Sequence, residues 1–143
     1  MISCDTNILF HAYNASSPFH IKALDFLTSQ AENRNFAMCE LVLMEFYILL
    51  RNPAVIRKPL HPRKAVDICR SYRKNRAWRV LDYPGNIMNK IWDMAAKPEF
   101  PRRSIFDARL AFTLLYHGVT EFATRDAKHF TDFGFRKVWD PLT

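Results

Sequence analysis

Apolar residues follow two alternating patterns along the chain, short continuous runs and longer stretches with helical spacing. The short runs predict buried strands at residues 2–4, 36–39, 78–81, 121–124 and 136–139. Apolar residues spaced three and four apart predict helices at 19–31, 41–50, 87–96 and 104–117, and another begins at 61–62. Strands that alternate with helices are typical of a parallel sheet covered on both faces. The pattern therefore predicts one three-layer α/β/α domain over residues 1–143, with a central, mainly parallel sheet of about five short strands.

Helix-breaking and capping residues support these boundaries. The apolar stretch 41–50 is followed by Arg51, Asn52 and Pro53, a sequence that ends a helix. Ser104 is a suitable N-cap for the late helix, and Gly118 is suited to terminate it. We expect residues 98–103 to form a basic, proline-rich loop, and a turn or short helix to begin at residue 126.

The composition indicates a folded protein without a membrane segment. Of the 143 residues, 49% are hydrophobic and 24% are charged, which supports one core and does not favour disorder. No apolar run approaches the roughly 20 residues that cross a bilayer. The first residues lack a basic region and carry Asp5 where a signal peptide would be apolar. We therefore expect the mature protein to start near Met1 and to stay in the cytoplasm.

The cysteines and histidines do not predict a zinc or disulfide site. Cys4, Cys39 and Cys69 are far apart, odd in number and without a Cys-x-x-Cys pair, so we expect them to pack in the core. None of the five histidines has a metal-ligand spacing such as His-Glu-x-x-His.

The positive charge is concentrated in one region. The net charge is +7, and the segment from Arg51 to Arg79 holds ten basic residues against one acid, Asp67. A basic region of this density suits a polyanion such as nucleic acid. A solvated surface that serves only solubility is the alternative.

Four acidic residues occupy positions where acids are unusual. Asp5 and Asp126 directly follow predicted strands, at the carboxyl edge where parallel sheets form their sites. Glu45 and Asp107 have apolar neighbours at helical spacing, so each shares a face with an apolar stripe. Burial of an unpaired charge is costly, and we expect a cation beside Glu45. Asp132 is a weak fifth candidate.

Each of these acids also has a structural explanation. Asp5 could cap a helix or a turn, and Glu45 could pair with an arginine. Asp107 could stabilise the first turn of its helix through the helix dipole. If all four instead converge, their mutual repulsion requires a cation, and hard oxygen ligands suit Mg²⁺ or Mn²⁺. A divalent ion beside a basic surface favours phosphodiester hydrolysis, in which the metal polarises the phosphate and lowers the pKa of an attacking water.

Four segments carry a resemblance to a known family. They are residues 4–9 (CDTNIL), 43–46 (LMEF), 105–111 (IFDARLA) and 124–130 (TRDAKHF), each beside the expected element. In this order they resemble a PIN-domain nuclease and, more narrowly, a VapC-type toxin of a bacterial type II toxin–antitoxin pair. The resemblance covers nearly the whole chain.

The resemblance implies a metal-dependent endoribonuclease. Asp5, Glu45, Asp107 and Asp126 would hold one or two Mg²⁺ or Mn²⁺ ions, and metal-activated water would hydrolyse RNA. It also implies a homodimer and a cognate antitoxin that occupies the active-site groove. Many relatives carry Asn at the position of Asp126, and the Asp in this chain should strengthen metal binding.

The same resemblance suggests roles for residues around the acids. Thr6, Asn7 and Thr124 match positions that support the acids by hydrogen bonding. Arg109 and Arg125 could contact phosphate or form external salt bridges. Our mechanistic hypothesis makes Asp5 and Asp107 the principal metal ligands. Glu45 would bind directly or through water, and Asp126 would complete the site or orient the nucleophile.

Two other functions compete with this interpretation. The first is a non-catalytic nucleic-acid-binding module whose acids only brace arginine side chains. The second is a Mg²⁺-dependent hydrolase of small phosphates, but its expected Asp-x-Asp motif is absent because Thr6 and Asn7 follow Asp5. The basic region could contact RNA or the antitoxin, charge does not separate RNA from DNA, and a tRNA, rRNA or mRNA target would each be compatible.

Overall fold

The computed structural model describes residues 1–143 and contains one five-stranded sheet. Every neighbouring pair of strands is parallel, in the order β3-β2-β1-β4-β5. The strands are β1 (Ile2–Cys4), β2 (Phe36–Cys39), β3 (Arg79–Leu81), β4 (Glu121–Ala123) and β5 (Lys137–Trp139). The predicted five-stranded parallel sheet is confirmed.

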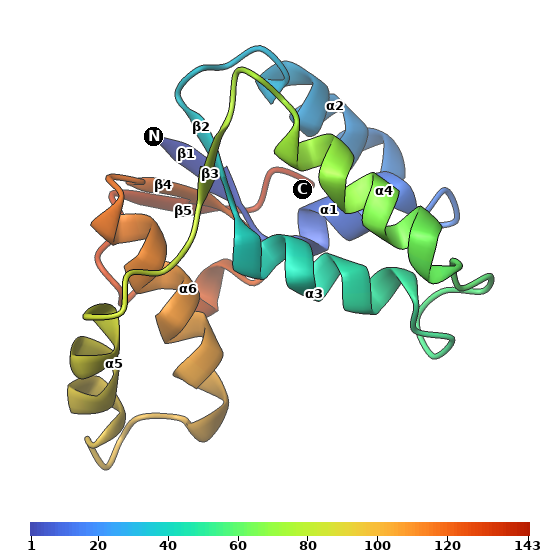
Figure 1. Ribbon diagram of the computed structural model, residues 1–143. Coiled ribbons are helices and arrows are strands. Elements are labelled where there is room, and N and C mark those ends of the chain that lie inside the picture. Colours follow the sequence, from blue (N-terminus) through green and yellow to red (C-terminus); the bar gives the residue numbers. More distant parts are fainter.

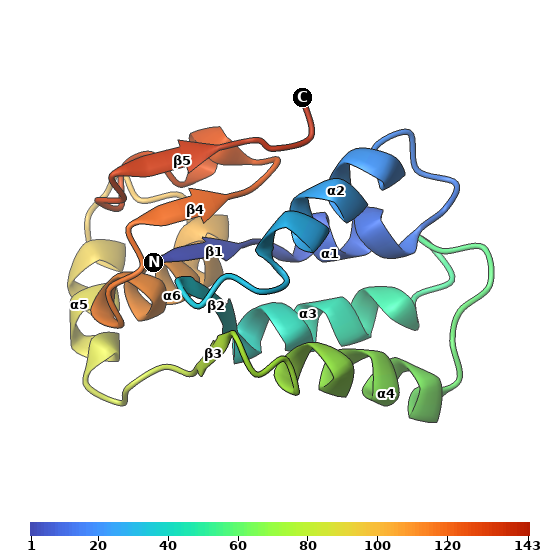
Figure 2. The same cartoon turned by 90° about the horizontal axis from the view of Figure 1, so that it is seen from above.

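Helices cover both faces of this sheet, which completes the predicted three layers. In Figures 1 and 2, α5 and α6 lie on one side of the strands, and the other four helices lie on the opposite side and beyond the strand ends. No helix is both long and apolar enough to span a membrane. The α-helices are α1 (Thr6–Tyr13), α2 (His20–Gln30), α3 (Glu40–Leu50), α4 (Pro62–Arg73), α5 (Ile87–Ala95) and α6 (Ile105–Tyr116), and the short 3-10 helices are η1 (Arg102–Ser104) and η2 (Ala127–His129).

Helix α1 was not among the predicted elements. The sequence Asp-Thr-Asn is typical of a turn, and it concealed a helix whose N-cap is Asp5. The Asp5 side chain accepts a hydrogen bond from the Thr6 amide, and Ile8, Leu9 and Ala12 form the buried face of α1. The helical spacing of these three apolar residues in the sequence could have predicted α1. The strand bounds, and the helix bounds that were predicted at both ends, agree with the structure to within one residue.

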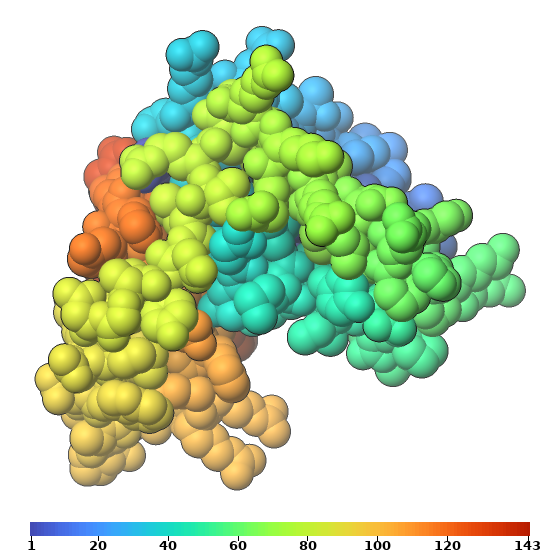
Figure 3. Space-filling model, in the orientation of Figure 1, coloured from blue at the N-terminus to red at the C-terminus, as the bar shows by residue number.

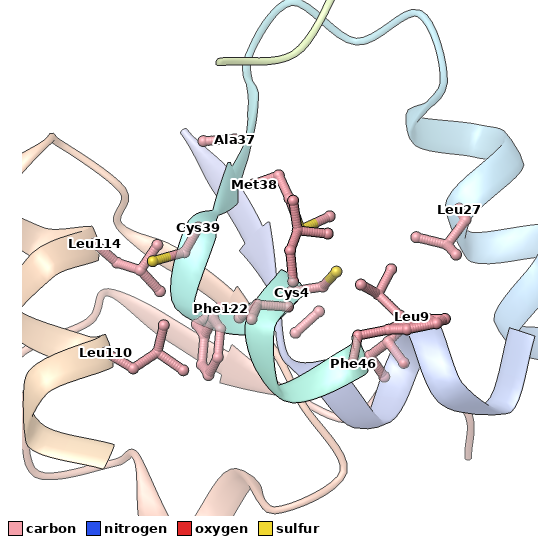
Figure 4. Close-up of a cluster of buried hydrophobic side chains, with 14 of the residues drawn as sticks. Cys4, Leu9, Leu27, Ala37, Met38, Cys39, Phe46, Leu110, Leu114 and Phe122 are labelled. Carbon is pink, nitrogen blue, oxygen red and sulfur yellow. The ribbon is translucent and has the colours of Figure 1, made fainter. Parts of the chain in front are cut away.

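The hydrophobic core lies on both faces of the sheet. Figure 4 shows Leu110 and Leu114 of α6 on one side, and Leu9, Leu27 and Phe46 of α1, α2 and α3 on the other. Strand residues lie between these two groups. Cys4 and Cys39 are buried there as predicted, Cys69 is half-buried, and all three thiols are free.

The sheet reverses its direction of growth beside β1. From β1 the chain adds β2 and then β3 on one side, then returns to place β4 and β5 on the other side. The return begins at Gly118, whose φ of 86° ends α6 as predicted. In open parallel sheets, binding sites form beyond the strand ends at this kind of reversal. The crevice between the ends of β1 and β4 is therefore the expected place for a site.

Candidate active site

Asp5 directly follows β1, beside the end of the neighbouring strand β4. Its side chain is buried, with 8% of the residue exposed. The Thr6 amide donates to its Oδ1 over 2.8 Å, and the Thr124 hydroxyl donates to its Oδ2 over 2.7 Å. Thr124 follows β4, so this second bond joins the two strands at the point where the sheet reverses.

Asn7 connects the same two chain segments. Its side-chain amide nitrogen lies 3.4 Å from Asp5 Oδ2 and 3.3 Å from Asp126 Oδ2, and it can donate to both. Its Oδ1 accepts from the Arg125 amide over 3.3 Å. The Thr124 hydroxyl also accepts from the Asp126 amide over 3.0 Å. Asn7 and Thr124 thus hold Asp126, otherwise exposed, near Asp5.

Glu45 joins this group through a hydroxyl. The Thr6 side chain donates to Glu45 Oε2 over 2.8 Å. Glu45 was predicted to share a face with core residues, and this prediction is partly wrong because not all of its apolar neighbours lie in the core. Glu45 itself is only half-buried, Ile48 is 61% exposed, and no ion pair includes Glu45. No cationic side chain of this protein therefore pairs with Glu45.

Asp107 lies in the first turn of α6. It is half-buried above Leu110, Ala111 and Leu114, which are buried as predicted. Asp107 makes no ion pair. Figure 3 shows a hollow in the surface between α3 and α6, the helices that carry Glu45 and Asp107.

The electrostatics show that the acids influence one another. Burial raises the pKa of Asp5 to about 6, the charges of Glu45 and Asp126 add to this rise, and the Thr124 and Thr6 hydrogen bonds oppose it. Burial also raises the pKa of Asp107, with a contribution from Asp126. Asp126 therefore acts on both Asp5 and Asp107, which places the four acids in one electrostatic group.

His129 belongs to this region although the sequence analysis assigned it no role. The electrostatic influence of His129 opposes the rise in the pKa of Asp107. Its position three residues after Asp126, within a segment that resembles the family, was the available evidence.

The donor chemistry of the group fits a divalent cation. Four carboxylates supply hard oxygen ligands, and a cation would relieve the repulsion between them. As the side chains stand, no three acidic, histidine or cysteine groups are close enough together to hold an ion. Glu45 is half-exposed and Asp126 is exposed, so burial in the core fixes neither side chain.

Comparison with known proteins decides the family. Residues 2–136 match the model of the PIN domain. The chain belongs to the PIN-domain family. It is 52% identical over 143 residues to a protein named ribonuclease VapC24 in two strains of Mycobacterium tuberculosis, CDC 1551 and H37Rv. The matched region covers 100% of this chain and 98% of that relative, so within the PIN-domain family the chain groups with the VapC proteins.

Solved structures of PIN-domain proteins share the fold at low sequence identity. Mycobacterium tuberculosis VapC20, described as a sarcin-ricin loop cleaving toxin, has a TM-score of 0.68 at 20% identity and covers 93% of this chain and 92% of its own. VapBC2 from Rickettsia felis, bound to promoter DNA, has a TM-score of 0.63 at 18% identity and covers 98% and 100%. These likenesses confirm the fold.

The two arginines suggested for phosphate contact are held by other groups in this PIN domain. The Arg125 guanidinium lies 3.7 Å from the centre of the Phe19 ring and forms an ion pair with Asp140 over 3.4 Å. Arg109 lies over the Tyr83 ring at 3.8 Å. The salt bridge considered for Arg125 is therefore present, but it is half-buried and not external. A phosphate contact by either residue stays a prediction.

The basic region of this PIN domain lies along α4 and the segments that flank it. Arg70 and Arg73 border a groove of about 360 Å³ between α3 and α4, together with the exposed apolar residues Met44 and Ile48. Arg73 also pairs with Glu40 over 2.6 Å. A groove with an apolar floor and cationic edges suits a protein segment that is apolar and acidic.

Proposed function

We propose that this chain is a Mg²⁺- or Mn²⁺-dependent endoribonuclease, the toxin of a toxin–antitoxin pair. The observation that carries the proposal is the group of Asp5, Glu45, Asp107 and Asp126 at the reversal of a parallel sheet, where Asp5 is buried despite its charged neighbours. Carboxylates whose pKa is raised by burial and by neighbouring charges cluster at functional sites. The 52% identity to a protein named as a ribonuclease supports the same reaction.

In this proposal the acids divide the work according to their surroundings. Asp5 and Asp107 are the principal ligands of the cation, Glu45 binds directly or through water, and Asp126 completes the site. A bound divalent ion supplies polarisation of the scissile phosphate and a lower pKa for the attacking water. Thr6 and Thr124 hold the two oxygens of Asp5 by donating hydrogen bonds.

Asn7 keeps the exposed carboxylate of Asp126 beside the crevice through its side-chain amide. Asp126 has fewer protein contacts than Asp5, so it retains the freedom to orient a water molecule or to accept its proton. That difference supports Asp126 as the member of the group that acts on the nucleophile.

The direct test is cleavage of a structured RNA by Asp5→Asn protein with Mg²⁺ present. We expect cleavage by the unaltered chain, loss of cleavage in EDTA, and loss in the variant. Unaltered cleavage by Asp5→Asn would contradict the proposal. The competing binding module predicts no cleavage and RNA binding that EDTA does not change.

The resemblance implies that the antitoxin occupies the active-site groove, and we propose that an apolar part of it also binds the groove between α3 and α4, since α3 carries Glu45 as well. Met44 and Ile48 are 62% and 61% exposed, which is unusual for large apolar side chains. We expect Met44→Glu/Ile48→Glu protein to cleave RNA without being inhibited by the cognate antitoxin.

The Arg70→Glu/Arg73→Glu variant tests whether the basic edge contacts RNA or the antitoxin. If it contacts RNA, the variant should bind RNA more weakly and with a smaller salt slope than the unaltered chain.

A homodimer and a cytoplasmic location are further parts of the proposal. Trp92, Phe106 and Tyr116, on α5 and α6, are each more than half exposed, and such exposed aromatic residues favour an interface. Light scattering on the purified protein measures the number of chains. A monomer at all concentrations would contradict the dimer.

A further inference from the structure

A second hollow lies beside the acid group and has no assigned role. It is a cleft of about 590 Å³ between the end of α5, the segment that leads into α6, and the residues from η2 onward. Asp107 forms part of its wall, so the cleft opens directly onto one of the proposed metal ligands. Its volume falls within the usual range for sites that bind small molecules or parts of larger ones, about 300–1,000 Å³.

The cleft carries cationic groups that the fold does not use. Lys97, Arg103 and Lys128 are exposed on its walls, and none forms an ion pair within the protein. Two acids besides Asp107, Glu99 and Asp132, also line it and form no ion pair. The cleft therefore offers separate donors for an anion and acceptors for hydroxyl or amino groups, as a nucleotide requires.

The cleft also offers one aromatic ring without an aromatic partner. Phe133 packs edge-on against Phe112 at 5.6 Å and lies 6.0 Å from Phe130, so its ring belongs to the core. Phe100 is half-buried against the smaller hydrophobic cluster and pairs with no other ring. A ring of this kind is suited to stacking on a nucleobase.

The side chain of Ser104 adds a free hydroxyl at the same place. Ser104 precedes α6 as its N-cap but makes no capping hydrogen bond with its side chain. It is half-buried and lines the cleft. Its hydroxyl is therefore available to a ligand.

We propose that this cleft binds the nucleotide next to the scissile phosphate of a single-stranded RNA segment, its phosphate against Lys97 and Arg103 and its base against Phe100. The proposal rests on the ribonuclease function proposed above and adds a position for the strand. RNA would leave the acid group along η1 and η2, on the side of Asp107 away from the α3–α4 groove. The same chain could then offer different surfaces to RNA and to an antitoxin.

The first test measures binding without chemistry. Fluorescence anisotropy in EDTA compares a labelled single-stranded RNA on unaltered protein and on Lys97→Ala/Arg103→Ala protein. The matched control is Lys22→Ala/Arg34→Ala, which removes the same charge from exposed positions elsewhere. We expect the cleft variant to bind at least about tenfold more weakly than the control, and its salt slope to fall by roughly 1.4, the value for two phosphate contacts on a single strand.

The second test locates the nucleotide. RNA substrates of one sequence are shortened by one nucleotide at a time from either end, and kcat/KM is measured with Mg²⁺. For the unaltered chain, the presence of one particular end nucleotide should raise kcat/KM. In Phe100→Leu protein, this rise should be smaller by about fivefold or more. The same loss should follow when that nucleotide is made abasic in the unaltered protein.

The outcomes separate this inference from the proposed function. Equal affinities and salt slopes for the cleft variant and its control, with RNA cleavage intact, would overturn the cleft and leave the ribonuclease standing. Absence of cleavage by the unaltered chain would overturn the ribonuclease, and the binding comparison in EDTA would still decide whether the cleft holds RNA. A circular dichroism melt of each variant excludes loss of folding as the cause.

Discussion

The two sides of the acid group are built in opposite ways. On the β1–β4 side, Asp5 is buried and each of its oxygens accepts a hydrogen bond from the protein. On the α6 side, Asp107 is half-buried, makes no ion pair and borders an open cleft. In the proposed site, the β1–β4 side would therefore fix a metal ligand in position, and the α6 side would leave room for the substrate. A charged carboxylate therefore costs more folding free energy on the β1–β4 side, where it is buried, than on the α6 side, where it is half-buried.

The largest expected effect is loss of activity from either side. Asp5→Asn and Asp107→Asn should each lower kcat/KM for RNA cleavage by at least about a hundredfold, because each removes a charged ligand and supporting groups alone contribute ten- to hundredfold. Single-turnover cleavage with Mg²⁺ measures this loss. If one variant retained more than a tenth of the activity, the two sides would not share the reaction. Asp25→Asn, at an exposed position on α2, is the control.

The next effect tests whether the buried side depends on its hydroxyl. The Thr124 hydroxyl donates to Asp5 and accepts from the Asp126 amide, so Thr124→Val should reduce activity about ten- to hundredfold and stability by about 1–2 kcal/mol. Urea unfolding and RNA cleavage measure the two losses. Thr113→Val removes a hydroxyl that is equally buried but donates only to the Arg109 carbonyl. Equal losses of activity in both variants would show a general packing effect.

A third prediction concerns the cost of the buried charge. The pKa of Asp5 lies near 6 in the folded protein, above its ordinary value of 3.8, because burial disfavours the carboxylate. The fold therefore benefits from protonation of Asp5 below about pH 4 and loses that benefit as the pH rises through 6. At pH 7 and without metal, the free energy of unfolding of Asp5→Asn protein should be about 2–3 kcal/mol higher than that of the unaltered chain, so the variant should be more stable.

Thermal and urea unfolding in EDTA between pH 4 and pH 8 test this prediction. The gain should vanish near pH 4, and Asp107→Asn should show a smaller gain because its carboxylate is only half-buried. A stability gain for Asp5→Asn that does not change with pH would rule out the buried charge as its cause.

The smallest effect is expected at Asp132. This carboxylate is exposed in the cleft and outside the network of Asn7 and Thr124. Asp132→Asn should change RNA cleavage by no more than about threefold, because a hydrogen bond from a nucleotide to this exposed carboxylate only replaces one from water. A loss as large as that of Asp107→Asn would make Asp132 a fifth member of the acid group.

The sequence predicted most of the fold because the apolar patterns were strong. Short buried strands and long apolar helices such as α6 differ clearly in length and spacing. Helix α1 escaped because its N-cap belongs to a sequence that also forms turns, and only eight residues follow. The local sequence at Asp5 was compatible with a turn and with a helix. The packing of this segment against the edge of the sheet favours the helix.

The site was harder to predict where it depends on tertiary packing. The order of strands brings Asp5 and Asp126 to one crevice, and their positions after strands already indicated this. The exposure of Ile48 could not be predicted, because an apolar stripe has the same spacing on a core face and on a docking face. The cleft beside Asp107 depends on the distance between α5 and η2, which no local pattern records.

The position of β1 in the middle of the sheet also determines when the molecule becomes complete. β1 is synthesised first, yet its neighbour β4 contributes Thr124, which lies 119 residues after Asp5. At typical rates of translation this separation corresponds to on the order of ten seconds. During that time one edge of β1 has no partner strand, and Asp107 and Asp126 have not both emerged. A fragment that ends before Asp126 therefore carries no complete acid group, so the proposed active site exists only when nearly the whole domain has been made.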